Sequence, residues 1–132
     1  MVEMELFRIR IDDTRSDQLV ILKEKKGERL LPIVIGVYEA DAIRLKVNGA
    51  QLPRPLTHDL FINALSKLGA VIDRIVIHKL FQGTYFARLV IKKPDGSEEE
   101  VDSRPSDAIA LAVRAGAGLF AEEQLLDFYP LQ

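Results

Sequence analysis

The sequence predicts a single α+β domain: a mixed, largely antiparallel sheet of about six strands, three main helices and a short C-terminal helix. Three observations support this. Short apolar segments with a period of two alternate with segments whose apolar residues recur at helical spacing. Turn residues separate the segments at short intervals. The length of 132 residues fits one domain, so residues 1–132 are taken as one unit.

The first third of the chain predicts three strands. Apart from Phe7, residues 4–12 alternate apolar and polar side chains, as in a half-buried strand. Residues 19–22 form a short, fully apolar run that predicts a central strand. A hairpin turn at 25–28 leads to a third strand at 30–35, in which Pro32 indicates an edge or a bulge.

The pattern changes to a helix after Gly36. The first helix extends to the stop signal Asn48-Gly49. The second runs from about 55 to 68, and its apolar stripe comprises Leu60, Phe61, Ala64, Leu65 and Leu68. The third spans about 105–115. Its apolar residues cover most of the circumference, which predicts a buried helix.

The remaining elements lie between and after the second and third helices. The expected strands cover residues 71–80, 85–92, 98–101 and, as a last short strand, 119–120. The C-terminal helix is expected at 122–128.

Composition excludes several classes of protein. Hydrophobic residues make up 48% and charged residues 29%, an ordinary globular balance. The absence of cysteine excludes disulfides and thiolate metal sites. No apolar run approaches the roughly 20 residues of a membrane span. Glu3 and Glu5 stand where a signal peptide would carry basic residues, so we expect a cytoplasmic protein without membrane association.

The charge balance bears on nucleic-acid binding. The formal net charge is −2, and both signs are spread evenly along the chain. Proteins that bind nucleic acid by neutralising phosphates usually carry a basic surplus. Tight, sequence-independent binding is therefore not expected unless a metal ion or a local basic patch contributes.

Two helices begin with the same pattern. An Arg-Pro pair is followed by a hydroxyl residue and an aspartate, first as Arg54, Pro55, Thr57 and Asp59, then as Arg104, Pro105, Ser106 and Asp107. Proline suits a first turn, a hydroxyl can cap free N–H groups, and an acid offsets the helix dipole. This structural interpretation is the more common one for the motif by itself.

The functional interpretation is an anion site. Arg54 and Arg104, with Thr57 and Ser106 at the open helix starts, could hold a phosphate. His58 lies beside Asp59, and such a pair can supply an acid–base function or metal ligands. Glu39 lies in the first turn of the first helix, where offsetting the dipole is the simpler role and metal binding the alternative.

Five segments of the chain carry a resemblance to a known family. They are 31–36 (LPIVIG), 39–40 with 42–43 (EA and AI), 54–60 (RPLTHDL), 83–87 (GTYFA) and 102–112 (DSRPSDAIALA). With these segments in order over nearly its whole length, the chain resembles the bifunctional nuclease domain family, and in particular its small bacterial members. The resemblance implies a sheet of mixed direction flanked by helices. It also implies phosphodiester hydrolysis, because plant members are credited with cutting both DNA and RNA.

The leading hypothesis is therefore a metal-assisted nuclease acting on DNA or RNA. In it, His58, Asp59 and Asp107 are the catalytic residues, and Arg54, Arg104, Ser106 and Thr57 bind the substrate. Asp59, Asp107 and Glu39 would hold Mg²⁺ or Mn²⁺ through carboxylate oxygens. The alternative is a non-catalytic binding or scaffold domain that recognises a phosphorylated ligand or a protein through the same helix starts, and the balanced charge favours it.

Two further expectations concern stability and assembly. Arg104, between a strand end and a buried helix, is expected to contribute on the order of 2 kcal/mol if it pairs with a carboxylate there. Strands that are apolar on both faces need more cover than three helices provide. We therefore expect a homodimer or larger homo-oligomer, to whose interface the apolar segment 125–131 could contribute.

Overall fold

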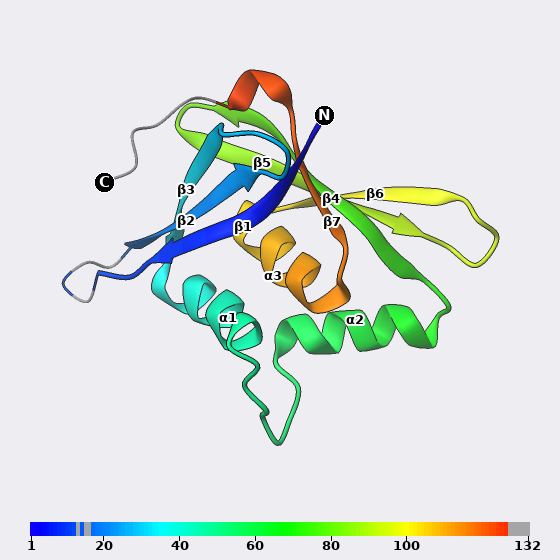
Figure 1. The fold of residues 1–132 in the computed structure, drawn as a ribbon. Helices are drawn as coiled ribbons and strands as arrows, with labels where there is room; N and C mark the ends of the chain where they lie inside the picture. The colour runs from blue at the N-terminus through cyan, green and yellow to red at the C-terminus, as the bar shows by residue number, and fades with distance from the viewer. Residues whose placement is uncertain (13, 15–16, 127–132) are drawn as a thin grey trace.

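The computed structural model describes residues 1–12, 14 and 17–126 (Figure 1). The elements, in chain order, are β1 (Val2–Arg10), β2 (Asp17–Glu24), β3 (Leu30–Gly36), α1 (Val37–Val47), α2 (Thr57–Lys67), β4 (Val71–Phe81), β5 (Thr84–Lys92), β6 (Glu98–Ser103), α3 (Pro105–Ala115), β7 (Gly118–Ala121) and the 3₁₀ helix η1 (Glu123–Leu125). The predicted α+β class is confirmed.

The described strands form one sheet in the order β3-β2-β1-β7-β4-β5-β6. Its pairs are antiparallel except β4 with β7, which run parallel. The sheet has seven strands, close to the total of about six expected, and each of the seven segments predicted as strands is one of them. The short strand β7 lies at its centre, between β1 and β4, and joins the N-terminal hairpins to the C-terminal ones.

The positions of the N-terminal strands correct one prediction. The apolar run Leu19–Leu22 lies in β2, which is next to the edge and not central, because β3 forms the edge. Val20 and Leu22 belong to the main core, while Ile21 is buried outside it. The segment is apolar throughout because β2 is buried on both faces, and not because it is central in the sheet. Pro32 lies in β3, as expected for an edge strand.

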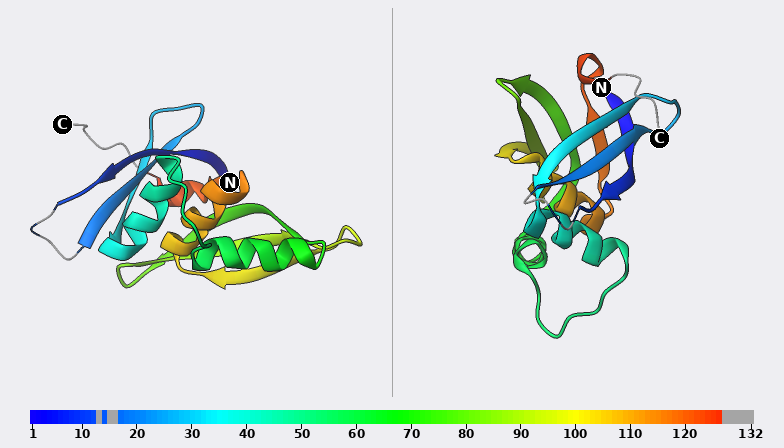
Figure 2. Two further views of the ribbon diagram at one scale, coloured as in Figure 1. Left: turned by 90° about the horizontal axis from the view of Figure 1, so that it is seen from below. Right: turned by 90° about the vertical axis from the view of Figure 1, so that its left-hand side faces the viewer.

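Helix α3 is embedded in the fold, as predicted. It packs against β4, β5 and β7 and against both other helices. Ala108, Ala110 and Ala112 are almost fully buried, and their small side chains allow the helix backbone to lie close to its neighbours. Figures 1 and 2 show the three helices gathered on the same side of the curved sheet, with α3 innermost. This arrangement fixes the position of the α3 N-terminus.

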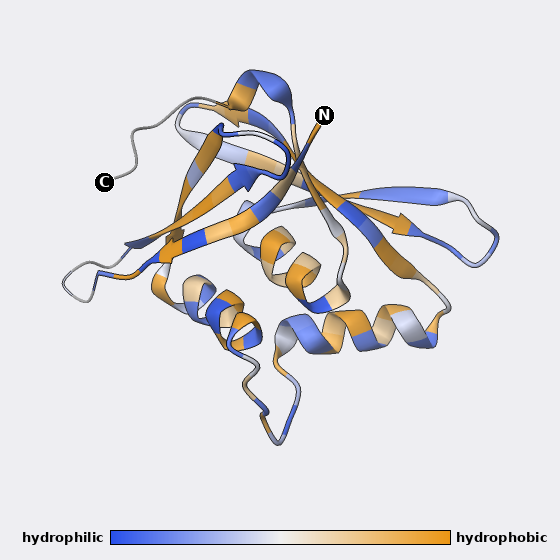
Figure 3. Cartoon of the chain, in the orientation of Figure 1, coloured by the Kyte–Doolittle hydropathy of each residue, from blue (hydrophilic) through white to orange (hydrophobic). Residues whose placement is uncertain are grey.

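Helix α2 differs from the expectation of a packed apolar stripe. None of its residues is buried. Ile62 and Leu65 pack against the core, whereas Leu60 and Phe61 on the predicted stripe are exposed, as is the C-cap residue Leu68. The helix covers α3 and β4 with one side only. Figure 3 shows hydrophobic bands along α2, in contrast to the hydrophilic strand β6.

At the C-terminus, η1 takes the place of the first part of the helix predicted at 122–128. The rest of that prediction, and most of the apolar segment 125–131, lies outside the described residues. No helix in the described part of the chain has the length and apolar character needed to cross a membrane.

Candidate functional site

The α3 N-terminus is defined by its Arg-Pro pair. Residues before proline avoid the helical region, and Arg104 is accordingly extended, with φ −67° and ψ 145°. Pro105 occupies the first turn, where its missing N–H costs no hydrogen bond. No side chain caps this helix start, so the predicted capping role of Ser106 is wrong. The first turn of α3 therefore keeps backbone N–H groups that have no helical partner.

Asp107 connects the starts of two helices. Its Oδ1 lies 2.9 Å from Nε2 of His58 in the first turn of α2. Its Oδ2 accepts a hydrogen bond of 2.9 Å from Nε of Arg104, and Nη2 of Arg104 donates to Oδ1 at 3.3 Å. The two residues named on separate motifs are thus brought together, and Arg104 binds the same carboxylate.

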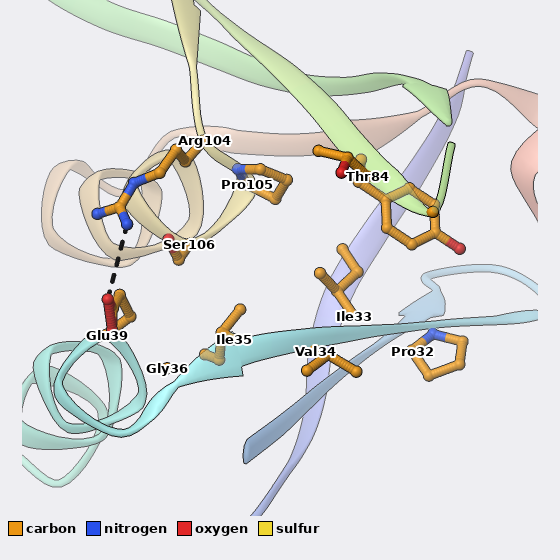
Figure 4. A pocket seen from close by; sticks show the side chains of 12 residues that line it. Pro32, Ile33, Val34, Ile35, Gly36, Glu39, Thr84, Arg104, Pro105 and Ser106 are labelled. Atoms are coloured by element: carbon orange, nitrogen blue, oxygen red, sulfur yellow. Dashed lines mark ion pairs between the residues drawn. The ribbon is translucent and has the colours of Figure 1, made fainter. Parts of the chain in front are cut away.

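Glu39 extends this cluster to the start of α1. Its Oε1 lies 3.6 Å from Nη1 of Arg104 (Figure 4). Its carboxylate folds back over Gly36, and a Cβ at position 36 would collide with it. The glycine that ends β3 therefore leaves room for Glu39 beside Arg104. We call Glu39, His58, Arg104 and Asp107 the helix-start cluster.

Burial and charge act in opposite directions on Asp107. Partial burial alone would raise the pKa of its carboxyl group, but hydrogen bonds from Arg104 and His58 outweigh burial and hold the pKa below its ordinary value. The hydrogen bond to Asp107 likewise raises the pKa of Arg104. The carboxylate is ionised at neutral pH and can orient the His58 ring through Nε2. The Nδ1 atom of His58 has no hydrogen-bond partner among the described residues.

A pocket of about 360 Å³ lies beside the cluster (Figure 4). One wall is β3 from Pro32 to Gly36, and the opposite wall consists of Gly83, Thr84 and Tyr85. The α3 start, with Arg104, Pro105 and Ser106, closes one end together with Glu39. We call this the β3–α3 pocket. Four of the five segments that carry the family resemblance contribute to it.

Asp59 lies apart from this cluster. Its Oδ1 accepts a hydrogen bond of 3.0 Å from Nε of Arg114, and its Oδ2 accepts one of 2.9 Å from the backbone N–H of Leu56. Asp59 thus caps its own helix, a role that the sequence suggested for Thr57, which is exposed at the first position of α2. Arg54 is also exposed and lines a second pocket with Asp59 and Arg114. The two Arg-Pro motifs therefore belong to different pockets: Arg104 lines the β3–α3 pocket, and Arg54 lines the second one.

Sequence reasoning missed Arg114. Its side chain is only 5% exposed, and it donates hydrogen bonds of 2.9 Å to the carbonyl oxygens of Ala110 and Ala42 besides its bond to Asp59. One guanidinium thus joins α1, α2 and α3. An arginine in the last turn of a helix predicted to be buried was the available signal, because such a residue needs partners.

The carboxylates do not form a preassembled metal site. The described residues contain no group of three or more His, Cys, Asp or Glu side chains placed to hold an ion. Glu39 and Asp107 both contact Arg104, and Asp59 faces Arg114. As arranged here, the three predicted ligands do not fit a shared Mg²⁺ or Mn²⁺.

The fold and this arrangement define an α+β domain in which a His–Asp pair and an arginine lie at an uncapped helix start beside a pocket. The chain belongs to the bifunctional nuclease domain family, which matches residues 20–130.

Among its relatives, an uncharacterised protein of Mycobacterium tuberculosis is 37% identical over 126 residues, which cover 96% of this chain and 74% of that protein. Bifunctional nuclease 1 of Arabidopsis thaliana is 31% identical over 79% of this chain. Bifunctional nuclease 2 of Oryza sativa subsp. japonica is 28% identical over the same share. The matched region is 33% of each plant protein, so the chain spans about a third of their length.

Proposed function

We propose that this protein is a nuclease that hydrolyses phosphodiester bonds of DNA, RNA or both. The observation that carries the proposal is the His58–Asp107 pair beside Arg104 at the uncapped start of α3, in a chain that belongs to the bifunctional nuclease domain family. A helix start and an arginine favour a phosphate, and a carboxylate-oriented histidine is suited to proton transfer.

In the proposed reaction, Arg104 and the free N–H groups of the α3 start bind the phosphate oxygens. His58, oriented by Asp107, accepts a proton from the water that attacks phosphorus, and the bond from phosphorus to the leaving oxygen breaks. The leaving oxygen then takes up a proton from the histidinium or from solvent. Each group in this scheme belongs to the helix-start cluster or to the backbone beside it.

The dependence on Mg²⁺ or Mn²⁺ and the roles of Asp59, Arg54 and Thr57 at the reaction centre stay predictions. An ion held by Glu39 and Asp107 would have to displace the Arg104 guanidinium from at least one of them. Cleavage assays with Mg²⁺, with Mn²⁺ and with EDTA distinguish a metal-dependent reaction from one that needs no metal ion. Cleavage that persists in EDTA assigns the chemistry to the side chains; cleavage that needs the ion means that the cluster rearranges around it.

The test of the nuclease itself compares the wild type with Asp107→Ala. DNA and RNA oligonucleotides should be cut by the wild type under at least one of these conditions and far more slowly by the variant. Asp95→Asn, in the exposed turn between β5 and β6, serves as the control and should cut like the wild type. Equal background cleavage by all three proteins would refute the proposal.

A non-catalytic binding domain remains the second candidate, and the net charge of −2 favours it. In that case the α3 start holds a phosphorylated ligand or a protein partner, and His58 and Asp107 only support the helix start. Ligand binding without turnover would identify this function.

We also propose that the protein forms a homodimer or a larger homo-oligomer in the cytoplasm. Leu60, Phe61 and Leu68 of the α2 region and Val71 at the start of β4 are exposed apolar residues that a second copy could cover. The mass in solution tests this assembly.

A further inference from the structure

Ser106 lines the β3–α3 pocket, and its hydroxyl group has no hydrogen-bond partner among the described residues. The residue as a whole is 6% exposed. In Figure 4 it lies between Arg104 and the β3 wall. This end of the pocket thus offers an unused hydroxyl, free backbone N–H groups and a guanidinium.

The charge at this end suits one phosphate group and no more. Arg104 is the cationic residue among those that line the pocket, and the Glu39 carboxylate stands on its other side. A chain of phosphates would meet this carboxylate, and the residues that line the pocket supply no second cation to neutralise it. The overall charge of −2 agrees with a ligand held by one phosphate and not by an extended backbone.

The rest of the pocket is apolar. Pro32, Ile33 and Ile35 form one wall, and Tyr85 lies on the opposite wall. A volume of about 360 Å³ is at the small end of the range of roughly 300–1,000 Å³ found for small-molecule sites. An aromatic ring and aliphatic side chains are the usual surroundings of an unstacked base. A base that remains paired and stacked in a duplex could not enter.

We propose that the β3–α3 pocket holds a single unpaired nucleotide, with its phosphate at the α3 start and its base between β3 and Tyr85. This inference rests on the proposed nuclease function and specifies its substrate: a single-stranded segment or a strand end. It also predicts weak salt dependence, because neutralising one phosphate of a single strand gives a slope of about −0.7 in log K against log salt concentration.

Binding measurements test the pocket independently of cleavage. Uridine 5′-monophosphate, adenosine 5′-monophosphate, uridine and inorganic phosphate are titrated into the full-length protein and followed by calorimetry and by amide NMR. We expect both nucleotides to bind at least tenfold more tightly than uridine or phosphate. The largest shifts should fall on the amides of Ser106, Asp107 and Thr84.

Variants test which pocket residue binds the phosphate and which one binds the base. Arg104→Gln should weaken nucleotide binding about tenfold, and Tyr85→Leu should have a similar effect through the base. Ser106→Ala should weaken binding without lowering the melting temperature, because the hydroxyl has no partner to lose. Arg44→Gln is the control: Arg44 pairs with Asp41 on the exposed side of α1 and should leave binding unchanged.

The outcomes separate this inference from the nuclease proposal. Nucleotide binding that Arg104→Gln and Tyr85→Leu weaken supports the pocket even if no strand is cleaved. Cleavage without such binding, nucleotides that bind no better than phosphate, or binding unaffected by these variants would each overturn the pocket assignment and leave the nuclease proposal to its own test.

Discussion

Replacing Asp59 with alanine should destabilise the whole domain, because Asp59 is the anionic partner of a buried arginine. The side chain of Arg114 is 5% exposed, while that of Asp59 is 38% exposed. Without Asp59, the guanidinium keeps its bonds to the carbonyl oxygens of Ala110 and Ala42 but loses its counter-charge. The backbone N–H of Leu56 loses its cap as well.

The magnitude follows from these two losses. Breaking a fully buried ion pair costs about 3–5 kcal/mol, and the partial exposure of Asp59 lowers this to about 2–3 kcal/mol. Loss of the cap adds about 1 kcal/mol. The expected total is on the order of 3–4 kcal/mol, a large part of the roughly 5–15 kcal/mol that stabilises a typical domain. The melting temperature should fall by about 10–15 °C.

Urea and thermal unfolding of Asp59→Ala measure this loss. The matched control is Asp41→Ala, which removes the carboxylate of an exposed ion pair with Arg44 on α1 and should cost well under about 1 kcal/mol. In the Arg114→Met background, Asp59→Ala should cost much less than in the wild type, because no buried charge is left unpaired. Equal midpoints for Asp59→Ala and Asp41→Ala would show that the pairing with Arg114 does not stabilise the fold.

Three further predictions address the surface, the titration and the assembly. Arg104 is 64% exposed, so Arg104→Ala should lower the unfolding free energy by less than about 1 kcal/mol in urea melts. This is below the roughly 2 kcal/mol expected from the sequence. A loss greater than about 1 kcal/mol would mean that the ion pairs of Arg104 are stronger than exposed pairs usually are. Because the pKa of Asp107 in the fold is held below its ordinary 3.8, its ion pairs stabilise the fold above that pH and are lost as the pH falls through the lowered pKa. The difference in unfolding free energy between wild type and Asp107→Asn should thus be constant at neutral pH and shrink below about pH 4; a constant difference down to pH 2 would contradict this. Light scattering should give a multiple of 14.8 kDa for the wild type and a lower mass for Leu60→Glu with Leu68→Glu; a wild-type monomer would refute the oligomer.

The sequence predicted the elements well where local physics decides them. The start of α3 follows from Arg104-Pro105, and its burial follows from apolar residues around the helix. The place of β3 at the sheet edge follows from Pro32. The central position of β7 could not be foreseen, because a four-residue strand carries little periodicity and its pairing with β1 and β4 is set by the whole fold.

In the candidate site, too, some features follow from the local sequence and others depend on the whole fold. His58 and Asp107 are 49 positions apart, and the repeated motif gave a reason to consider both. The motif could not show that Asp59 faces Arg114, since neighbouring residues on a helix point about 100° apart. Arg114 carried no motif at all, and Ile33 and Tyr85 lie in segments of the family resemblance to which the sequence assigned no role in the site. Their positions depend on how α1, α2 and α3 pack and on how β3 comes to face the start of β5.

The most direct test of the central claim is kcat/KM for a fluorogenic single-stranded oligonucleotide with wild type and His58→Asn. A histidine that transfers the proton contributes about 10²–10⁴-fold, so the variant should lose at least 10²-fold while it unfolds near the wild-type midpoint. His78→Asn, which changes the other histidine on β4, should keep wild-type kcat/KM. Equal kcat/KM for wild type and a folded His58→Asn would contradict the assignment of the reaction to the helix-start cluster.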